Sequence, residues 1–233
     1  MYKKYNKPFK SKKNKNIVLG GYYMLKYEKK LNLDKHYEKL IKNDKLKNFY
    51  SVLLGIISYI FLYFIAKYVL TFLPDFQPWG DFEVWFYIGR IEISKVDLVY
   101  FLYGLLLSVY GLRKLLKITI QNHSVKDKRD NIPKSLLING FYSKVRHPMY
   151  GTFIILYAGF MLSLKSLIGV IIALIIIFVQ YLNAFYEERK KLIPIFREEY
   201  EFYTNNVQSM LLIKFDFFAV IIGILFNTIG FVF

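Results

Sequence analysis

Long hydrophobic runs separated by short polar segments dominate this chain. The longest runs extend from Phe49 to Leu73, Val96 to Leu116, Leu167 to Tyr186 and Leu211 to Phe233. Because an α-helix rises about 1.5 Å per residue, each run is long enough to cross a hydrocarbon layer of roughly 30 Å. Only Lys67 interrupts the first run, near its far end, where a long side chain is able to bring its ammonium group to the interface. The pattern therefore predicts membrane-spanning helices.

A shorter apolar run, from Met149 to Leu164, is separated from the run that starts at Leu167 by only Lys165-Ser166. Two helices joined by so short a turn must be antiparallel neighbours, so both ends of this hairpin return to the same side of the membrane. The chain is thus predicted to be an all-α polytopic membrane protein with about five transmembrane helices. Whether the first arm of the 149–186 hairpin spans fully or re-enters stays open.

Charge is distributed unevenly between the two sides of these predicted spans. The chain has 33 Lys and Arg against 17 Asp and Glu, and residues 1–48 hold 15 lysines and four acidic residues. Residues 74–95 instead hold four acidic and two basic residues. The positive-inside rule therefore predicts a cytoplasmic N-terminus and an outside C-terminus. A basic segment beside a span favours attraction to anionic lipid, and no nucleic-acid-binding motif accompanies it.

Composition agrees with a membrane protein. The chain is 55% hydrophobic with a mean hydropathy of +0.28, too apolar for a soluble domain of this size. It has no cysteine, which excludes disulfides and thiolate metal sites. Its N-terminus carries too much charge before the first apolar run for a cleaved signal peptide. Abundant Lys, Asn, Ile and Tyr are typical of an AT-rich genome, so we expect a prokaryotic plasma membrane.

Four segments follow from these patterns. We expect a basic cytoplasmic segment at 1–48, two transmembrane helices in 49–117, a core with the helical hairpin at 118–209, and a C-terminal transmembrane helix at 210–233. Within the core, a basic loop from Ile118 to Arg146 precedes the hairpin. A charged amphipathic segment, interrupted at Pro194, follows it.

Two polar clusters flank the predicted hairpin. Arg146 and His147 directly precede Pro148, which is well suited to the first turn of a helix. The positive end of that helix, with free backbone N–H groups, would attract an anion. Glu187 and Glu188 lie where the returning helix ends, on the same side. Such a set suits a ligand with both carboxylate and ammonium groups, although interfacial anchoring alone also explains residues of these types.

The residues in these clusters form a longer motif. Gly140, Tyr142, Arg146-His147-Pro148 and Tyr150 are followed by Glu187-Glu188, Leu192, Phe196, Glu199-Tyr200 and Tyr203. This spacing resembles that of the integral membrane methyltransferases typified by isoprenylcysteine carboxyl methyltransferase and phospholipid methyltransferase. The resemblance covers about Leu112 to Val207.

The resemblance implies an S-adenosylmethionine site at the cytoplasmic surface and no metal. Arg146 and His147 are the candidate catalytic residues. Glu188 best matches the family's cofactor-binding glutamate, and Glu187 is the second choice. The implied cofactor-binding set is Lys134, Ser135, Leu136, Leu137, Tyr142, His147, Pro148, Met149, Tyr150, Glu187 and Glu188. The implied reaction is carboxyl O- or N-methylation of a lipophilic or small membrane-soluble acceptor, so the partners are the lipid bilayer and that acceptor, without nucleic acid.

One departure from the family bears on the acceptor. Relatives that methylate a prenylated cysteine carboxylate carry an arginine shortly before the acidic pair, where this chain has Gln180, Asn183 and Ala184.

Two other functions remain open at the level of sequence. NADPH-dependent sterol reductases share the Arg-His-Pro-x-Tyr helix start, but Gly151-Thr152-Phe153 fits the methyltransferase pattern better. A non-catalytic membrane protein that keeps the fold is the other alternative. The sequence makes no prediction about oligomeric state.

Overall fold

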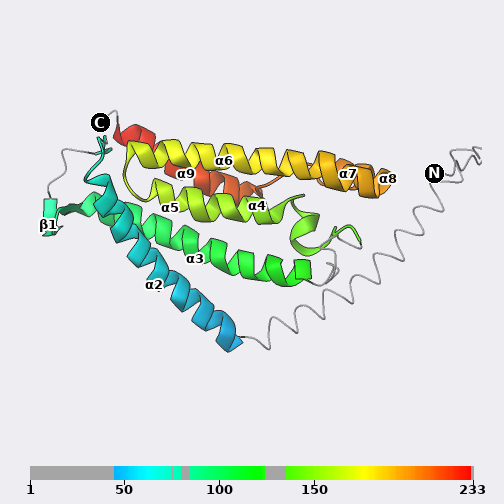
Figure 1. Ribbon diagram of the computed structural model, residues 1–233, viewed down its shortest axis with the longest axis horizontal. Helices are drawn as coiled ribbons and strands as arrows, with labels where there is room; N and C mark the ends of the chain where they lie inside the picture. The colour runs from blue at the N-terminus through cyan, green and yellow to red at the C-terminus, as the bar shows by residue number, and fades with distance from the viewer. Residues whose placement is uncertain (1–44, 75, 80–83, 124–134, 232–233) are drawn as a thin grey trace, which may run out of the picture. The chain divides into compact units, whose positions relative to one another are not determined.

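A computed structural model describes residues 45–74, 76–79, 84–123 and 135–231, and within these ranges the chain is a helical bundle with one β-hairpin (Figure 1). The long helices are α2 (Lys45–Leu70), α3 (Lys95–His123), α6 (Leu167–Glu187) and α9 (Lys214–Gly230). Shorter helices are α4 (Pro148–Phe153), α5 (Gly159–Leu162), α7 (Ile193–Phe196) and α8 (Glu198–Asn206). Most of the predicted basic segment 1–48 lies outside the described residues.

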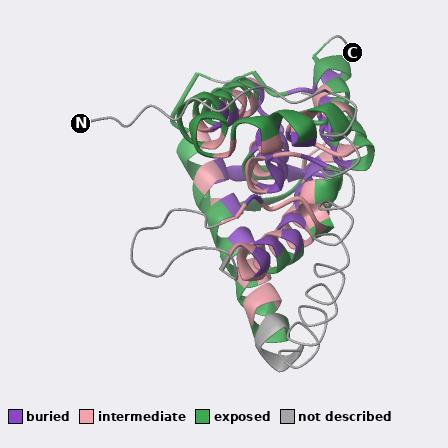
Figure 2. Cartoon of the chain, turned by 90° about the vertical axis from the view of Figure 1, so that its right-hand side faces the viewer, coloured by how far each residue is buried: buried purple, intermediate pink, exposed green. Residues whose placement is uncertain are grey.

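In the part of the chain that the structure describes, three helical stretches are long and apolar enough to cross a membrane, namely Phe49–Leu70, Lys95–Asn122 and Leu167–Phe196. The helix over Pro148–Leu162 is apolar but shorter, and α9 has 17 residues. The exposed outer faces of the helices surround a buried interior (Figure 2). A mostly helical fold is confirmed, with three candidate membrane-spanning helices among the described residues, whereas the count of five spans stays a prediction.

The predicted hairpin is present. Its first arm consists of α4, the π-helical turn η2 (Ile154–Ala158) and α5, and its second arm is α6. Ser166 caps α6 by accepting a hydrogen bond from the N–H of Gly169 at 3.0 Å, which satisfies a donor that the first helical turn leaves free. Lys165, in the turn, has a φ of 53°. The two arms pack against each other as the short turn requires.

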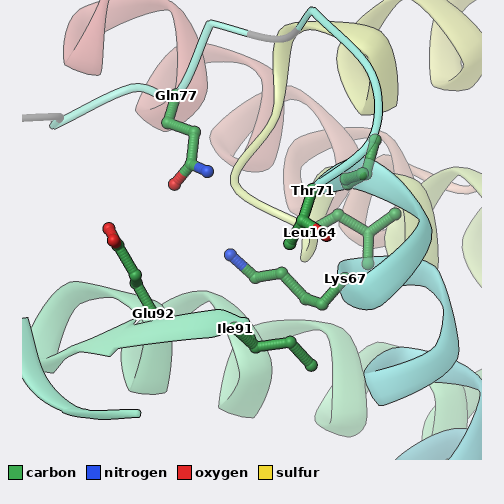
Figure 3. Close-up of a pocket in the computed structure, with 7 residues that line it drawn as sticks. Lys67, Thr71, Gln77, Ile91, Glu92 and Leu164 are labelled. Atoms are coloured by element: carbon green, nitrogen blue, oxygen red, sulfur yellow. The ribbon is translucent and has the colours of Figure 1, made fainter. Parts of the chain in front are cut away.

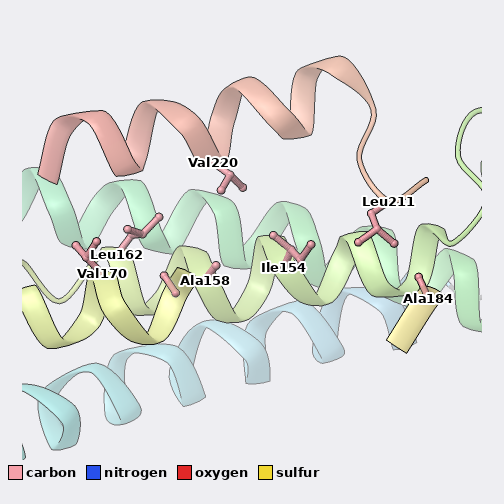
Figure 4. Packing of buried hydrophobic residues seen from close by; sticks show 8 residues of the cluster. Ile154, Ala158, Leu162, Val170, Ala184, Leu211 and Val220 are labelled. Atoms are coloured by element: carbon pink, nitrogen blue, oxygen red, sulfur yellow. The ribbon is translucent and has the colours of Figure 1, made fainter. Parts of the chain in front are cut away.

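The core of the bundle lies between the hairpin, α9 and the segment before α9. Its buried residues are Ile154, Ala158, Leu162, Val170, Ala173, Ala184, Leu211 and Val220 (Figure 4). Three of the eight are alanines, and small side chains let helix backbones approach closely where hydrophobic burial alone does not drive helices together.

Two buried ionic clusters connect the helices. Near the end of the bundle that carries the β-hairpin, Lys67 of α2 contacts Asp97 of α3 at 2.6 Å, and Lys165 reaches the same carboxylate at 3.3 Å. Lys67 is only 5% exposed, so the prediction that it extends to the interface is wrong. In the second cluster, Asp216 of α9 pairs with Lys114 and accepts a hydrogen bond from Tyr110 at 2.8 Å. These ion pairs account for charges within apolar helices.

Three local features differ from the sequence prediction. Helix α3 continues through His123, beyond the predicted end of the second span at Leu116. The segment before α3 contains an antiparallel hairpin of β1 (Val84–Ile88) and β2 (Ile91–Ser94). The predicted interruption at Pro194 is wrong, because the helical stretch Leu167–Phe196 runs through Pro194 and the chain breaks at Arg197, where φ is 43°. Proline inside a helix removes a hydrogen bond to the preceding turn, and here that preceding turn is the π-helical segment Glu188–Leu192, where regular i→i−4 bonding is already altered.

The Asp216 cluster leads to a stability prediction. Asp216→Ala should lower the free energy of unfolding by about 3–5 kcal/mol, because it leaves the Lys114 ammonium group buried without its counter-charge. The double variant Lys114→Met/Asp216→Leu should recover most of that loss, since it removes both charges. Denaturant titration in detergent micelles would measure this. Lys214→Met, at an exposed position, is the control, and equal losses in the single and double variants would contradict the explanation.

Candidate functional site

The imidazole of His147 lies between the two carboxylates that the hairpin brings back to it. Its Nε2 is 2.9 Å from Oε1 of Glu188, and its Nδ1 is 3.4 Å from Oε2 of Glu187. Adjacent residues of a helix point about 100° apart, so a ring placed between two consecutive carboxylates meets one on each side. His147 and Glu188 are 5% and 8% exposed. The hairpin therefore joins the two polar clusters that the sequence separates by forty residues.

A π-helical turn follows directly, η3 (Glu188–Leu192), and continues α6 toward α7. Such turns widen an α-helix locally and are frequent at functional sites. The change of geometry begins at the residue that contacts His147.

Arg146 completes the charged set. Its Nε lies 3.1 Å from Oε1 of Glu188, yet this buried N–H has no hydrogen bond of acceptable geometry to any group in the described part of the chain. The ring of Tyr150 stacks on that of His147 with centroids 5.7 Å apart. Two basic and two acidic side chains thus lie together, with His147 and Glu188 buried and Arg146 and Glu187 half-buried.

Backbone contacts fix the start of α4 against the segment before α9. The N–H of Arg146 donates to the carbonyl oxygen of Ser209 at 3.0 Å, and that of His147 donates to Met210 at 2.8 Å. The backbone N–H groups of Arg146 and His147 are therefore already hydrogen-bonded within the protein. The approach is so close that a Cβ on Gly151 would collide with the carbonyl oxygen of Leu211.

The end of α3 holds the loop before α4. Asn122 accepts a hydrogen bond from the hydroxyl of Tyr142 at 2.7 Å, and its Nδ2 lies 3.5 Å from Sδ of Met149. Gln121 donates to the carbonyl oxygen of Asn139 at 2.8 Å. The sequence prediction placed these two amides in a basic loop. The signal that would have located them is the continuation of the helical pattern beyond Leu116.

Helix α8 supports the same loop from the other side. The hydroxyl of Tyr203 donates to the carbonyl oxygen of Tyr142 at 2.6 Å. Leu136, Tyr200, Tyr203 and Val207 form a buried cluster, against which Phe196 packs. Neither tyrosine of α8 was a candidate site residue, although both belong to the recognised motif.

The predicted site residues thus fall into three groups. Arg146, His147, Tyr150, Glu187 and Glu188 are brought together around the imidazole. Tyr142 and Met149 are joined through Asn122, and Pro148 is buried at the start of α4. Of the remaining candidates, Leu136 packs in the α8 cluster, Ser135 and Leu137 are half-buried in the preceding loop, and Lys134 lies outside the described residues.

The pKa values of two groups in the site, the His147 imidazole and the Tyr142 hydroxyl, are shifted. Burial lowers the pKa of His147, but the hydrogen bonds and negative charges of Glu187 and Glu188 outweigh burial and raise that pKa above its ordinary value of 6.5. Burial raises the pKa of Tyr142 to about 12, so its hydroxyl stays protonated and serves as a donor. When it is protonated, His147 is able to donate to both carboxylates.

The fold and the site define a helical membrane protein with a buried ionic cluster at the open end of a helical hairpin. Residues 96–199 match the family described as phospholipid methyltransferase, and this stretch contains α3, the hairpin and the cluster around His147. This stretch thus matches the same family of integral membrane methyltransferases that the motif resembles. Comparison with curated proteins gave no match, and neither did comparison with solved structures.

The raised pKa of His147 predicts a pH dependence of stability. Below pH 6.5 folded and unfolded chains both hold the proton, so the pairing with Glu187 and Glu188 contributes fully. As the pH rises through the raised folded pKa, that contribution is lost. The difference in thermal stability between wild type and His147→Gln should therefore be largest near pH 6 and smallest in alkaline buffer. Comparing these two proteins cancels the contributions of the other two histidines. A difference that stays constant from about pH 6 to 9 would contradict it.

Proposed function

We propose that this protein is a membrane methyltransferase that uses S-adenosylmethionine as its methyl donor and a lipophilic or small membrane-soluble molecule as its acceptor. The observation that carries the proposal is the placement of His147 between Glu187 and Glu188, within the stretch that matches the methyltransferase family. A non-catalytic protein would use such a cluster only to join helices, as the Asp97 and Asp216 clusters do, and this role does not explain why the Nε of Arg146 lacks a well-aligned acceptor among the described residues.

The residues of the site fit the amino-acid part of this cofactor. The buried Nε of Arg146, which lacks a well-aligned acceptor among the described residues, suits a carboxylate. The carboxylates of Glu187 and Glu188 suit an ammonium group or ribose hydroxyls. Tyr142 offers an aromatic ring close to the same point. These complementary charges support the proposed roles of the predicted residues.

Net charge also favours such a ligand. Arg146 and protonated His147 balance the two glutamates, and loss of the imidazole proton leaves one net negative charge. S-adenosylmethionine carries one carboxylate, one ammonium and one sulfonium group, hence one net positive charge. Opposite net charges attract strongly where water is excluded. We therefore propose that the cofactor is bound with His147 neutral.

The side chains need to do little chemistry themselves. The cofactor would supply a methyl group already activated by its sulfonium. The protein's part is to orient donor and acceptor in line and to keep water away, and such positioning provides most of the acceleration in reactions of this kind. Arg146 and His147 would act by holding and orienting charge, with no strong general base required.

The acceptor would enter from the lipid side, between helices. Carboxyl O-methylation and N-methylation are both compatible with the family. The segment before the acidic pair favours an amine, because Gln180, Asn183 and Ala184 offer no cation there, and Ala184 is fully buried. In keeping with the charge distribution, we propose that the site faces the cytoplasm.

Loss of the Glu188 carboxylate should weaken cofactor binding. Glu188→Gln should raise the dissociation constant of S-adenosylhomocysteine about tenfold to a hundredfold, the usual effect of removing a hydrogen bond to a charged group. Calorimetry on protein in detergent or nanodiscs would measure it. Glu201→Gln, an exposed carboxylate on α8, is the matched control. Absence of binding to the wild type, or equal binding by Glu188→Gln, would refute the proposal.

Cofactor preference separates a methyltransferase from a sterol-reductase-like enzyme. Thr152, in the segment that differs from reductases, is fully buried and donates to the carbonyl oxygen of Pro148 at 2.8 Å. We expect S-adenosylmethionine, and not NADPH, to raise the midpoint of thermal unfolding, since only a ligand that binds the native state stabilises it. The reverse preference would favour the reductase. Incubation with labelled S-adenosylmethionine and host lipid extract would then identify the acceptor fraction.

A further inference from the structure

We infer that the β1–β2 hairpin is a membrane anchor whose outer strand lies among lipid headgroups, at the end of the bundle opposite the His147 cluster. Figure 1 shows β1 at one end of the helices and α7 and α8 at the other. The hairpin precedes the stretch that matches the methyltransferase family, so this inference is independent of the proposed reaction.

Strand β1 exposes four consecutive apolar side chains. Trp85 and Tyr87 are 60% and 65% exposed, and Phe86 and Ile88 are 43% and 45% exposed. Because successive residues of a strand point to opposite faces, both faces of β1 are apolar. In water, an exposed edge strand of this kind promotes aggregation. Lipid is a medium in which the same strand is stable.

Strand β2 holds the hairpin firmly on the bundle. Ile91, Ile93 and Ser94 are buried, in contrast to β1. The backbone N–H of Ser94 donates to Asp97 at 2.9 Å, and Lys165 lies 3.4 Å from the hydroxyl of Ser94. Figure 3 shows Ile91 and Glu92 of β2 beside Lys67 at the end of α2. The apolar strand is therefore presented in a fixed position.

The apolar surface of the hairpin continues the lipid-facing surface of the spans. Phe72, Leu73 and Phe76, which follow α2, are exposed, and the guanidinium of Arg90 lies 5.1 Å from the ring centroid of Phe72. Aromatic rings beside a basic group are typical of the membrane–water interface, where Trp and Tyr are enriched.

A second copy of the chain is a poorer occupant. Strand β1 has five residues. Pairing over that length buries much less than the roughly 1,200 Å² of a stable dimer.

The chain's two tryptophans allow a direct test. Trp79 is half-buried and donates to the hydroxyl of Tyr100 at 3.0 Å, whereas Trp85 is on the proposed anchor. In the variant Trp79→Phe, the fluorescence of Trp85 should be quenched by phosphatidylcholine vesicles brominated near the top of the acyl chain. It should be quenched at least twofold less by lipids brominated deep in the chain, and little by aqueous iodide. Trp85→Phe, which reports Trp79 alone, is the matched control.

Two results would overturn the inference. Quenching of Trp85 by iodide, without quenching by brominated lipid, would place β1 in water. Protection from both quenchers would mean that protein covers it, in which case crosslinking should detect a dimer. If Trp79→Phe does not fold, the fluorescence of Trp85 is obtained by subtracting the fluorescence of Trp85→Phe from that of the wild type.

Discussion

A charged side chain buried away from water is stable only beside an opposite charge, and this constraint organises the bundle. Asp97 holds Lys67 and Lys165 near the β-hairpin, Asp216 holds Lys114 between α3 and α9, and the two glutamates hold His147 at the far end. Each pairing joins elements distant in sequence. Since a buried charge without its partner is costly, each pairing also restricts how the helices are arranged. The candidate site follows the same rule, with its charges gathered in a place that suits a ligand.

The local parts of this arrangement were predictable. A turn of two residues dictates an antiparallel hairpin, Pro148 marks a helix start, and motif spacing located the acidic pair. Contacts set by long-range packing were not predictable. Neither the pairing of Lys67 with Asp97 nor that of Lys114 with Asp216 leaves a periodic signal in the sequence. The break at Arg197 was missed because proline has a general bias against helices, whereas the π-helical segment before Pro194 already departs from the regular bonding that proline disrupts.

The candidate site extends beyond the stretch that matches the family. The carbonyl oxygens of Ser209 and Met210 accept from the backbone before α4, and Tyr203 holds the loop that contains Tyr142. These residues follow position 199, where the match ends. The motif residues thus supply the ionisable groups, and the C-terminal part of the chain supports their backbone. This division explains why the contacts of Ser209 and Met210 are invisible to motif spacing.

The π-helical turn after Glu188 also affects how related sequences are aligned. Such a turn is equivalent to one extra residue inserted into an α-helix, so every side chain after Leu192 is rotated by about 100° from the position that regular helical counting gives. A relative lacking that residue would present a different face of α7 to the same loop. Alignments that place a gap between 188 and 192 would therefore mark a change of helix geometry, with the ionic cluster itself preserved.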